Sequence, residues 1–126
     1  MGNPNGKDST LEVSSETIEE VRVVTLKGEL DPKASDELFR FLESQLQNGY
    51  RKIIVECSGL GHITSQSLGT LVGICVRLRK RHGDIRLASL PNRIAKIFQL
   101  TGLSVLFDLY PNVDKAVESF RRELWM

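Results

Sequence analysis

Short segments rich in β-branched residues alternate with amphipathic helical segments along most of this 126-residue chain. Strands that alternate with short helices are joined by right-handed crossovers, which favours a largely parallel sheet. The first two strand segments are instead joined by a short polar link, which favours an antiparallel hairpin. We therefore predict an α/β fold in which about four helices pack on one mixed, mostly parallel β-sheet. The expected strands cover residues 10–14, 21–26, 52–57, 85–89 and 105–109, and Ser58-Gly59 are expected to form a turn after the third strand. The first expected helix has about four turns, with apolar residues from Ala34 to Leu46 and Asn48-Gly49 as its end. The next two cover 66–81 and 92–101, and Asn112 is expected to cap a last helix with apolar residues from Val113 to Leu124.

The segment 66–81 is the most apolar of the expected helices. Its apolar residues cover most of the helix circumference, so we expect this helix to be largely buried. Its last turn is basic and is followed by Gly83. Cations and a glycine are the usual ending of a helix, so they do not by themselves indicate a nucleic-acid site. The apolar residues are Leu68, Leu71, Val72, Ile74, Cys75, Val76 and Leu78, and the basic turn is Arg79-Lys80-Arg81-His82.

Length and composition limit the class of protein. A chain of 126 residues with 40% hydrophobic and 26% charged residues is expected to form one soluble domain. No apolar run reaches the roughly 18 residues of a membrane-spanning helix. The formal net charge of +1 argues against nucleic acid or an anionic membrane as a partner. We expect a flexible polar leader over residues 1–9 and a single domain over residues 10–126.

The cysteines and histidines indicate the compartment and argue against a metal. Cys57 and Cys75 each lie in an apolar segment, and their spacing matches no common zinc or redox motif. We expect two buried thiols in a reducing compartment, the cytoplasm. The sequence has two histidines with no thiols or carboxylates clustered beside them, so we expect neither a metal site nor a cofactor.

The segment between the third strand and the second helix concentrates the candidate chemistry. It reads Gly-Leu-Gly-His-Ile-Thr-Ser-Gln-Ser-Leu-Gly over residues 59–69, with a histidine and three hydroxyl groups. Ligands and modifications are often recognised at such strand-to-helix junctions. Thr64 or Ser65 is also a suitable N-cap of the helix, and capping alone could explain its presence.

Four motifs, in order and spacing, resemble the STAS domain family and, within it, the bacterial anti-sigma factor antagonists. The resemblance extends over about residues 10 to 122. It implies a STAS-like fold and a role in signalling through protein–protein contacts, without catalysis. The motifs are Gly28-Glu29-Leu30-Asp31, the loop 59–69, Pro91 with Ile94 and Phe98, and Thr101-Gly102-Leu103.

In that family the loop commonly reads Asp-Ser-Ser-Gly-Leu-Gly, and its first serine is phosphorylated by a partner that is both serine kinase and anti-sigma factor. The resemblance implies that Ser65 is the phosphorylated residue, with Thr64 and Ser67 as alternatives. It also implies that the unmodified domain binds this kinase, and that a serine phosphatase is a further partner. The residues expected to contact the partner are Asp31, Thr64, Ser65 and Gln66.

The chain departs from the family pattern at three positions of this loop. Thr64 replaces the aspartate, Gln66 the second serine and Ser67 the glycine. The family also includes docking subunits of sensory assemblies and of lipid-transport machinery. A docking subunit that works without phosphorylation is therefore the alternative function.

Catalysis and nucleotide binding are weaker alternatives. Asp31, His62 and Ser65 supply the residue types of a nucleophilic triad. However, the chain has no Gly-x-Ser-x-Gly motif, and a histidine three positions before the serine would have to fold back onto it. We therefore do not expect an enzyme. A helix N-terminus can accept phosphate, but the chain has no glycine-rich motif of the Walker type.

Overall fold

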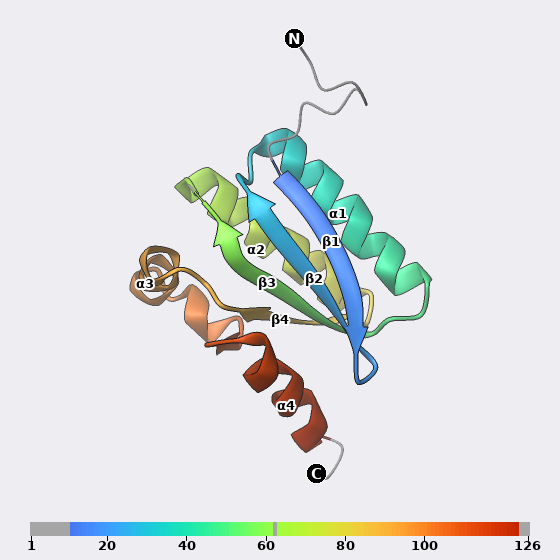
Figure 1. Cartoon of the computed structure of the whole chain (residues 1–126). Coiled ribbons are helices and arrows are strands. Elements are labelled where there is room, and N and C mark those ends of the chain that lie inside the picture. The colour runs from blue at the N-terminus through green and yellow to red at the C-terminus, as the bar shows by residue number, and fades with distance from the viewer. Residues whose placement is uncertain (1–10, 62, 124–126) are drawn as a thin grey trace.

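Five strands and four helices follow one another in the predicted order (Figure 1). The computed structural model describes residues 11–61 and 63–123, so the predicted leader lies outside the described residues. A short 3₁₀ turn, η1, is an addition to the prediction. The elements are β1 (Leu11–Ile18), β2 (Val21–Gly28), α1 (Pro32–Gln47), β3 (Lys52–Leu60), α2 (Ser65–Lys80), β4 (Asp84–Ala88), α3 (Asn92–Leu100), η1 (Leu103–Val105), β5 (Leu109–Tyr110) and α4 (Val113–Glu123).

The strands form one sheet in the order β1-β2-β3-β4-β5. β1 runs antiparallel to β2, and the other three pairings are parallel. This is the predicted mixed, mostly parallel sheet. The hairpin turn consists of Glu19 and Glu20, which both have positive φ angles, 48° and 69°. Two left-handed residues match the twist of an antiparallel hairpin, so β1 extends to Ile18 and the polar link is shorter than predicted.

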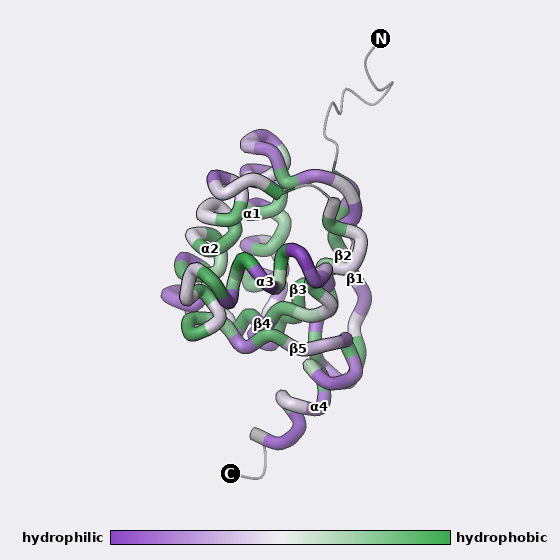
Figure 2. Tube along the Cα trace, turned by 90° about the vertical axis from the view of Figure 1, so that its left-hand side faces the viewer, coloured by the Kyte–Doolittle hydropathy of each residue, from purple (hydrophilic) through white to green (hydrophobic). Residues whose placement is uncertain are grey.

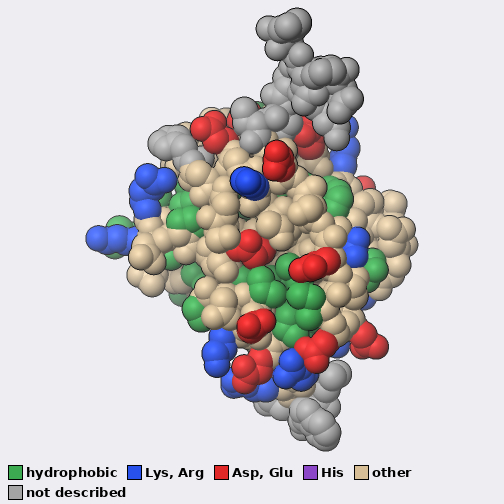
Figure 3. Space-filling view, in the orientation of Figure 1, with side chains coloured by type: hydrophobic (Ala, Val, Ile, Leu, Met, Phe, Trp, Pro, Cys, Tyr) green, Lys and Arg blue, Asp and Glu red, His purple; other side chains and the backbone are tan. Residues whose placement is uncertain are grey.

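Helices cover both faces of the sheet. The main core joins apolar side chains of α1, α2 and α3 to one face, and it includes the fully buried Leu38, Leu71 and Phe98. α4 crosses the other face, where Phe120 and Val117 pack against a smaller cluster (Figure 1). Figure 2 shows the hydrophobic segments of α1 and α2 alternating with polar ones, as amphipathic helices require. Figure 3 views the face that carries α4, where hydrophobic side chains gather among acidic ones.

The last strand was predicted in the wrong place. The apolar run 105–109 is not a strand, because Gly102 has a φ of 79° and leads into η1. Val105 at the end of this turn is 88% exposed, whereas Phe107 is buried in the core. The run therefore anchors a turn through Phe107, and β5 begins only at Leu109.

The third strand continues through a predicted turn. Ser58 and Gly59 belong to β3, and Gly59 pairs with Lys27 after a register shift between the two strands. A Cβ atom on Gly59 would lie 2.9 Å from the carbonyl oxygen of Leu26. Glycine is needed here because β2 approaches too closely for a side chain. The strand therefore reaches Leu60 and carries the candidate loop to the edge of the sheet.

α2 is buried on one face only. Val76, predicted to be buried, is 39% exposed, and Val72 is half-buried. The buried residues are those that face α1 and the sheet, so the prediction of a largely buried helix was wrong for the opposite face. Arg79 is more than a helix-end cation, because its guanidinium donates to the carbonyl oxygens of Leu106 (2.6 Å) and Ile85 (3.0 Å).

The two cysteines are free and buried, as predicted. Burial raises the pKa of the Cys57 thiol above its ordinary value, and it raises the pKa of Cys75 to about 12. Both thiols are therefore protonated at neutral pH. No helix in the described part of the chain is long and apolar enough to cross a membrane.

Neither thiol is expected to react with a disulfide reagent while the protein is folded. The thiolate is the reactive form, and both groups are buried and held in the neutral form. At pH 9, where an exposed thiol is about three quarters ionised, Ellman's reagent should label neither cysteine within minutes. It should label both at once in concentrated urea. Rapid labelling of the folded protein would contradict the buried positions of Cys57 and Cys75.

Candidate functional site

The start of α2 carries the three candidate hydroxyl groups, and they have different surroundings. Thr64 is the N-cap: its Oγ1 accepts from the backbone N–H of Ser67 (3.1 Å) and donates to Ser67 Oγ (3.1 Å). Ser67 is only 8% exposed. Ser65 is the first helical residue and is exposed, and its hydroxyl makes no hydrogen bond with the described residues. Ser65 is thus the hydroxyl most available to a partner.

Asp31 is the N-cap of α1. Its Oδ1 accepts from the backbone N–H of Ala34 at 2.7 Å, and its carbonyl oxygen accepts from Ser35 Oγ at 2.9 Å. Pro32 follows at the first helical position, which suits a helix start. The carboxylate that the sequence suggested as a contact therefore also has a structural role.

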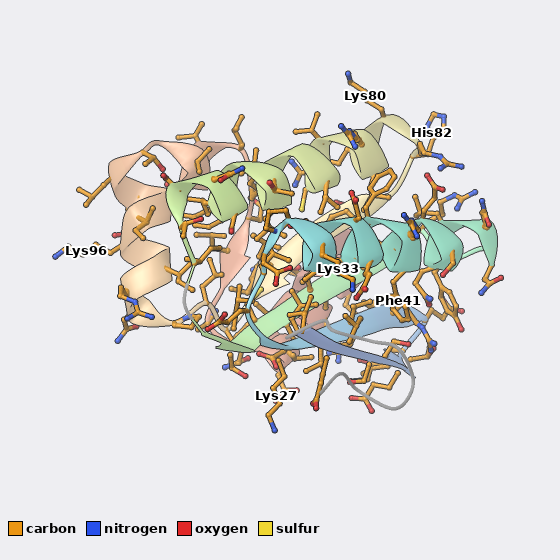
Figure 4. All side chains as sticks on the ribbon, turned by 90° about the horizontal axis from the view of Figure 1, so that it is seen from above. Lys27, Lys33, Phe41, Lys80, His82 and Lys96 are labelled. Atoms are coloured by element: carbon orange, nitrogen blue, oxygen red, sulfur yellow. The ribbon has the colours of Figure 1, made fainter. Side chains whose placement is uncertain are left out.

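The sheet brings Asp31 and Ser65 to the same edge. Gly28 at the end of β2 pairs with Leu60 at the end of β3, and the N–H of Gly61 donates to Gly28 O at 2.8 Å. α1 and α2 both start from this edge and then run side by side (Figures 1 and 4). Their N-termini, which favour negative charge, lie at the end of the sheet where α/β proteins bind ligands.

A groove of about 330 Å³ separates the exposed sides of α1 and α2. It starts beside Ser65, at the side chain of Gln66, and extends along α2 to Arg77. Two glycines of α2, Gly69 and Gly73, line it. The sequence analysis singled out Gln66 but missed Arg77 and the groove, for which the four-residue spacing of the two glycines was the available signal.

One cation reaches the loop from another element. The guanidinium of Arg93, at the start of α3, donates to the carbonyl oxygen of Gly61 at 3.5 Å. Nothing in the sequence analysis indicated this contact, because residues 61 and 93 become neighbours only through the pairing of β3 with β4.

The geometry of an Asp31-His62-Ser65 triad is not defined, because His62 lies outside the described residues. Of its other two members, Asp31 caps α1 and Ser65 starts α2, and they make no hydrogen bond with each other. In residues 11–61 and 63–123, the His, Cys, Asp and Glu side chains form no group of three that could hold a metal ion.

Thr64→Ala is expected to destabilise the protein and Ser65→Ala is not. Loss of an N-cap costs about 1 kcal/mol of unfolding free energy, because the amide of Ser67 loses its acceptor. Ser65→Ala removes a hydroxyl that bonds no described residue, so a change of less than about 0.5 kcal/mol is expected. Urea denaturation of both variants measures the difference. Equal loss in the two variants would contradict the assignment of Thr64 as the cap.

A family model and a curated relative match most of the chain. The model of the STAS domain matches residues 12–116. The anti-sigma-B factor antagonist of Staphylococcus aureus is 29% identical over 96 residues, which are 76% of this chain and 89% of that protein.

Solved structures share the fold. An anti-sigma factor antagonist from Mycobacterium paratuberculosis has a TM-score of 0.75 at 22% identity, over 96% of this chain and 99% of that chain. The Bacillus cell fate determinant SpoIIAA in its phosphorylated form has a TM-score of 0.64 at 22% identity, over 86% and 99%. A sulfate transporter family protein from Wolinella succinogenes has a TM-score of 0.72 at 12% identity, over 98% and 97%. The predicted fold is therefore confirmed.

Proposed function

Because this chain belongs to the STAS domain family, we propose that it is an anti-sigma factor antagonist, switched by phosphorylation of Ser65. In its unmodified form it binds a cytoplasmic anti-sigma factor that is also a serine kinase, and so frees a sigma factor. Names of relatives support the first part, since the Staphylococcus aureus protein is an anti-sigma-B factor antagonist. The observation that carries the second part is the exposed, unbonded hydroxyl of Ser65 at the start of α2.

A phosphate on Ser65 is compatible with an intact domain. The kinase transfers the γ-phosphoryl group of ATP to Ser65 Oγ, ADP leaves, and the hydroxyl proton passes to a base of the kinase. The product adds about −1.5 to −2 charges at the N-terminus of α2, where backbone amides and the helix dipole favour an anion. The exposed side chain can carry the group without entering the core. Phosphorylation thus changes the surface and leaves the fold unchanged.

The departures from the family loop fit this proposal in one respect. Thr64 stands where the family has aspartate, and it keeps the capping role that either side chain can fill. What is lost is a negative charge next to the acceptor. The unmodified surface is therefore less acidic at this point, while the phosphate adds the same charge of about −1.5 to −2 whichever residue stands at position 64.

The proposal is tested by phosphoryl transfer. The wild-type protein and Ser65→Ala are incubated with ATP and the anti-sigma factor kinase encoded nearest to it in the source genome. Phosphopeptide mass spectrometry should find one phosphate, on Ser65, and none on the variant. A serine phosphatase should remove it and restore binding. Phosphate on Thr64 or Ser67 would assign the regulatory site to that residue instead of Ser65. Stable binding without any phosphoryl transfer would support the antagonist function and contradict regulation by phosphorylation.

A docking subunit is the second candidate function. The structural likeness to a sulfate transporter family protein shows that this fold also occurs in transport proteins. In that case the domain would co-purify with a transporter or with other STAS proteins, and ATP would not release it. Neither function needs catalysis by this chain, so a serine-directed fluorophosphonate probe should not label Ser65.

A further inference from the structure

The α1–α2 groove contains two glycines that the fold itself does not require. Gly69 and Gly73 lie inside α2, and neither has the left-handed φ that favours glycine. A Cβ atom at either position would meet no atom within 4 Å. Glycine inside a helix is less stable than alanine, because the unfolded chain is more flexible. The chain therefore gives up stability at both positions with no gain in its own packing.

The positions of these glycines indicate what they provide. Gln66, Gly69, Gly73 and Arg77 repeat at three- and four-residue steps, so they line one side of α2. Asp36 and Phe39 of α1 line the opposite side of the groove. The absence of side chains at 69 and 73 leaves the middle of the groove open, and it lets another backbone approach closely.

The far end of the groove presents an oriented positive charge. The guanidinium of Arg77 lies over the ring of Phe39, 5.4 Å from its centre. Apart from this stacking, Arg77 makes no hydrogen bond or ion pair with the described residues. The ring fixes the direction of the guanidinium, which leaves its donors available to a carboxylate.

We propose that this groove receives an α-helix of the anti-sigma factor, with a carboxylate that pairs with Arg77. The inference rests on the proposed function and extends its contact surface away from Ser65. From Gln66 to Arg77 the groove spans about 17 Å of helix axis, which corresponds to about three turns of a partner helix. On the α1 side, the carboxylate of Asp36 requires a neutral or basic side chain in the partner. A second carboxylate near Ser65 would be repelled by the phosphate, so one acidic helix accounts for both binding and release.

Substitution of the glycines by alanine separates this role from a structural one. Gly69→Ala and Gly73→Ala should each raise the melting temperature by about 2 to 6 °C, and the double variant should raise it further. The same variants should bind the anti-sigma factor kinase about tenfold more weakly, because the new methyl groups occupy the groove. On the same samples, differential scanning calorimetry measures the melting temperature and isothermal titration calorimetry measures the affinity. A rise in stability with a loss of affinity is the expected result.

Arg77 provides a second, independent variant. Arg77→Ala should weaken binding about tenfold by removing the partner of the carboxylate. Lys80→Ala is the matched control, since Lys80 lies one turn later on α2 and points away from α1 (Figure 4). That variant should bind like wild type.

The outcomes distinguish the groove from the proposed function. If wild type binds the kinase but the glycine and Arg77 variants bind within about threefold of it, the groove is not the contact and the antagonist function stands. A glycine variant that melts lower than wild type also overturns the inference, because the glycine would then have an internal role. If wild type itself does not bind the kinase in the absence of ATP, the proposed function fails and the groove proposal fails with it.

Discussion

Phosphorylation of Ser65 is expected to weaken binding to the anti-sigma factor about a thousandfold while the fold remains unchanged. A partner carboxylate about 4 Å from the phosphate meets repulsion of about 4 kcal/mol per charge pair at an effective dielectric near 20. At about 1.4 kcal/mol per tenfold change, this corresponds to about three orders of magnitude in Kd. Isothermal titration of the unmodified and the enzymatically phosphorylated protein measures the difference.

Ser65→Asp should reproduce part of this effect. It adds one charge on a shorter side chain, so a loss of about hundredfold is expected. Ser14→Asp, on an exposed serine of β1, adds the same charge elsewhere and should leave binding within about twofold. The circular dichroism spectra of wild type and both variants should match, and Ser65→Asp should melt no lower than wild type, because the helix N-terminus favours the added charge. Unchanged affinity of both the phosphorylated protein and Ser65→Asp would remove Ser65 from the contact surface.

The sequence predicted the elements whose signals are local. The apolar stripe of α1 and the Asn48-Gly49 stop mark this helix in the sequence, but its cap, Asp31, was expected only as a contact residue. The predicted bounds of α3 differ from the observed ones by one residue. The predicted cap of α4 is confirmed, since Asn112 Oδ1 accepts from the N–H of Lys115 at 2.8 Å. Such signals need no knowledge of the sheet.

The sequence failed where a tertiary neighbour decided the conformation. The local pattern at Ser58-Gly59 predicts a turn, but Gly59 is a strand residue whose lack of a side chain allows the close approach of Leu26. The run 105–109 had the composition of a strand, but Phe107 is drawn into the core and Val105 faces solvent. Neither outcome could be derived from the local pattern, because both depend on what packs opposite.

The sequence suggested candidate residues for the site but not the surface around them. The loop and Ser65 were singled out from residue order and from the resemblance to the STAS family, and their role stays a prediction. The choice among three hydroxyl groups required coordinates, which show that Thr64 and Ser67 bond each other. The groove was hidden because its two walls come from α1 and α2, separated in sequence by a whole strand.

Leu71→Ala is expected to lower the free energy of unfolding by about 3 kcal/mol, the largest stability change among the substitutions considered. Leu71 is fully buried on the inner side of α2, where it belongs to the main core. Truncation removes apolar contacts and leaves a cavity that the surrounding strands and helices can close only in part. Chemical denaturation should show a lower midpoint with an unchanged m-value.

Val76→Ala is the matched control on the exposed side of the same helix. It removes methyl groups from a side chain that is 39% exposed, so a change of less than about 1 kcal/mol is expected. Affinity for the anti-sigma factor, measured well below the melting temperature, should be unchanged in Leu71→Ala because the exposed residues of α2 stay in place. Equal destabilisation by the two variants would mean that α2 is buried all round, as its composition suggested. A large difference would show instead that one side of α2 serves the core while the other side adds little to stability, as a surface open to a partner requires.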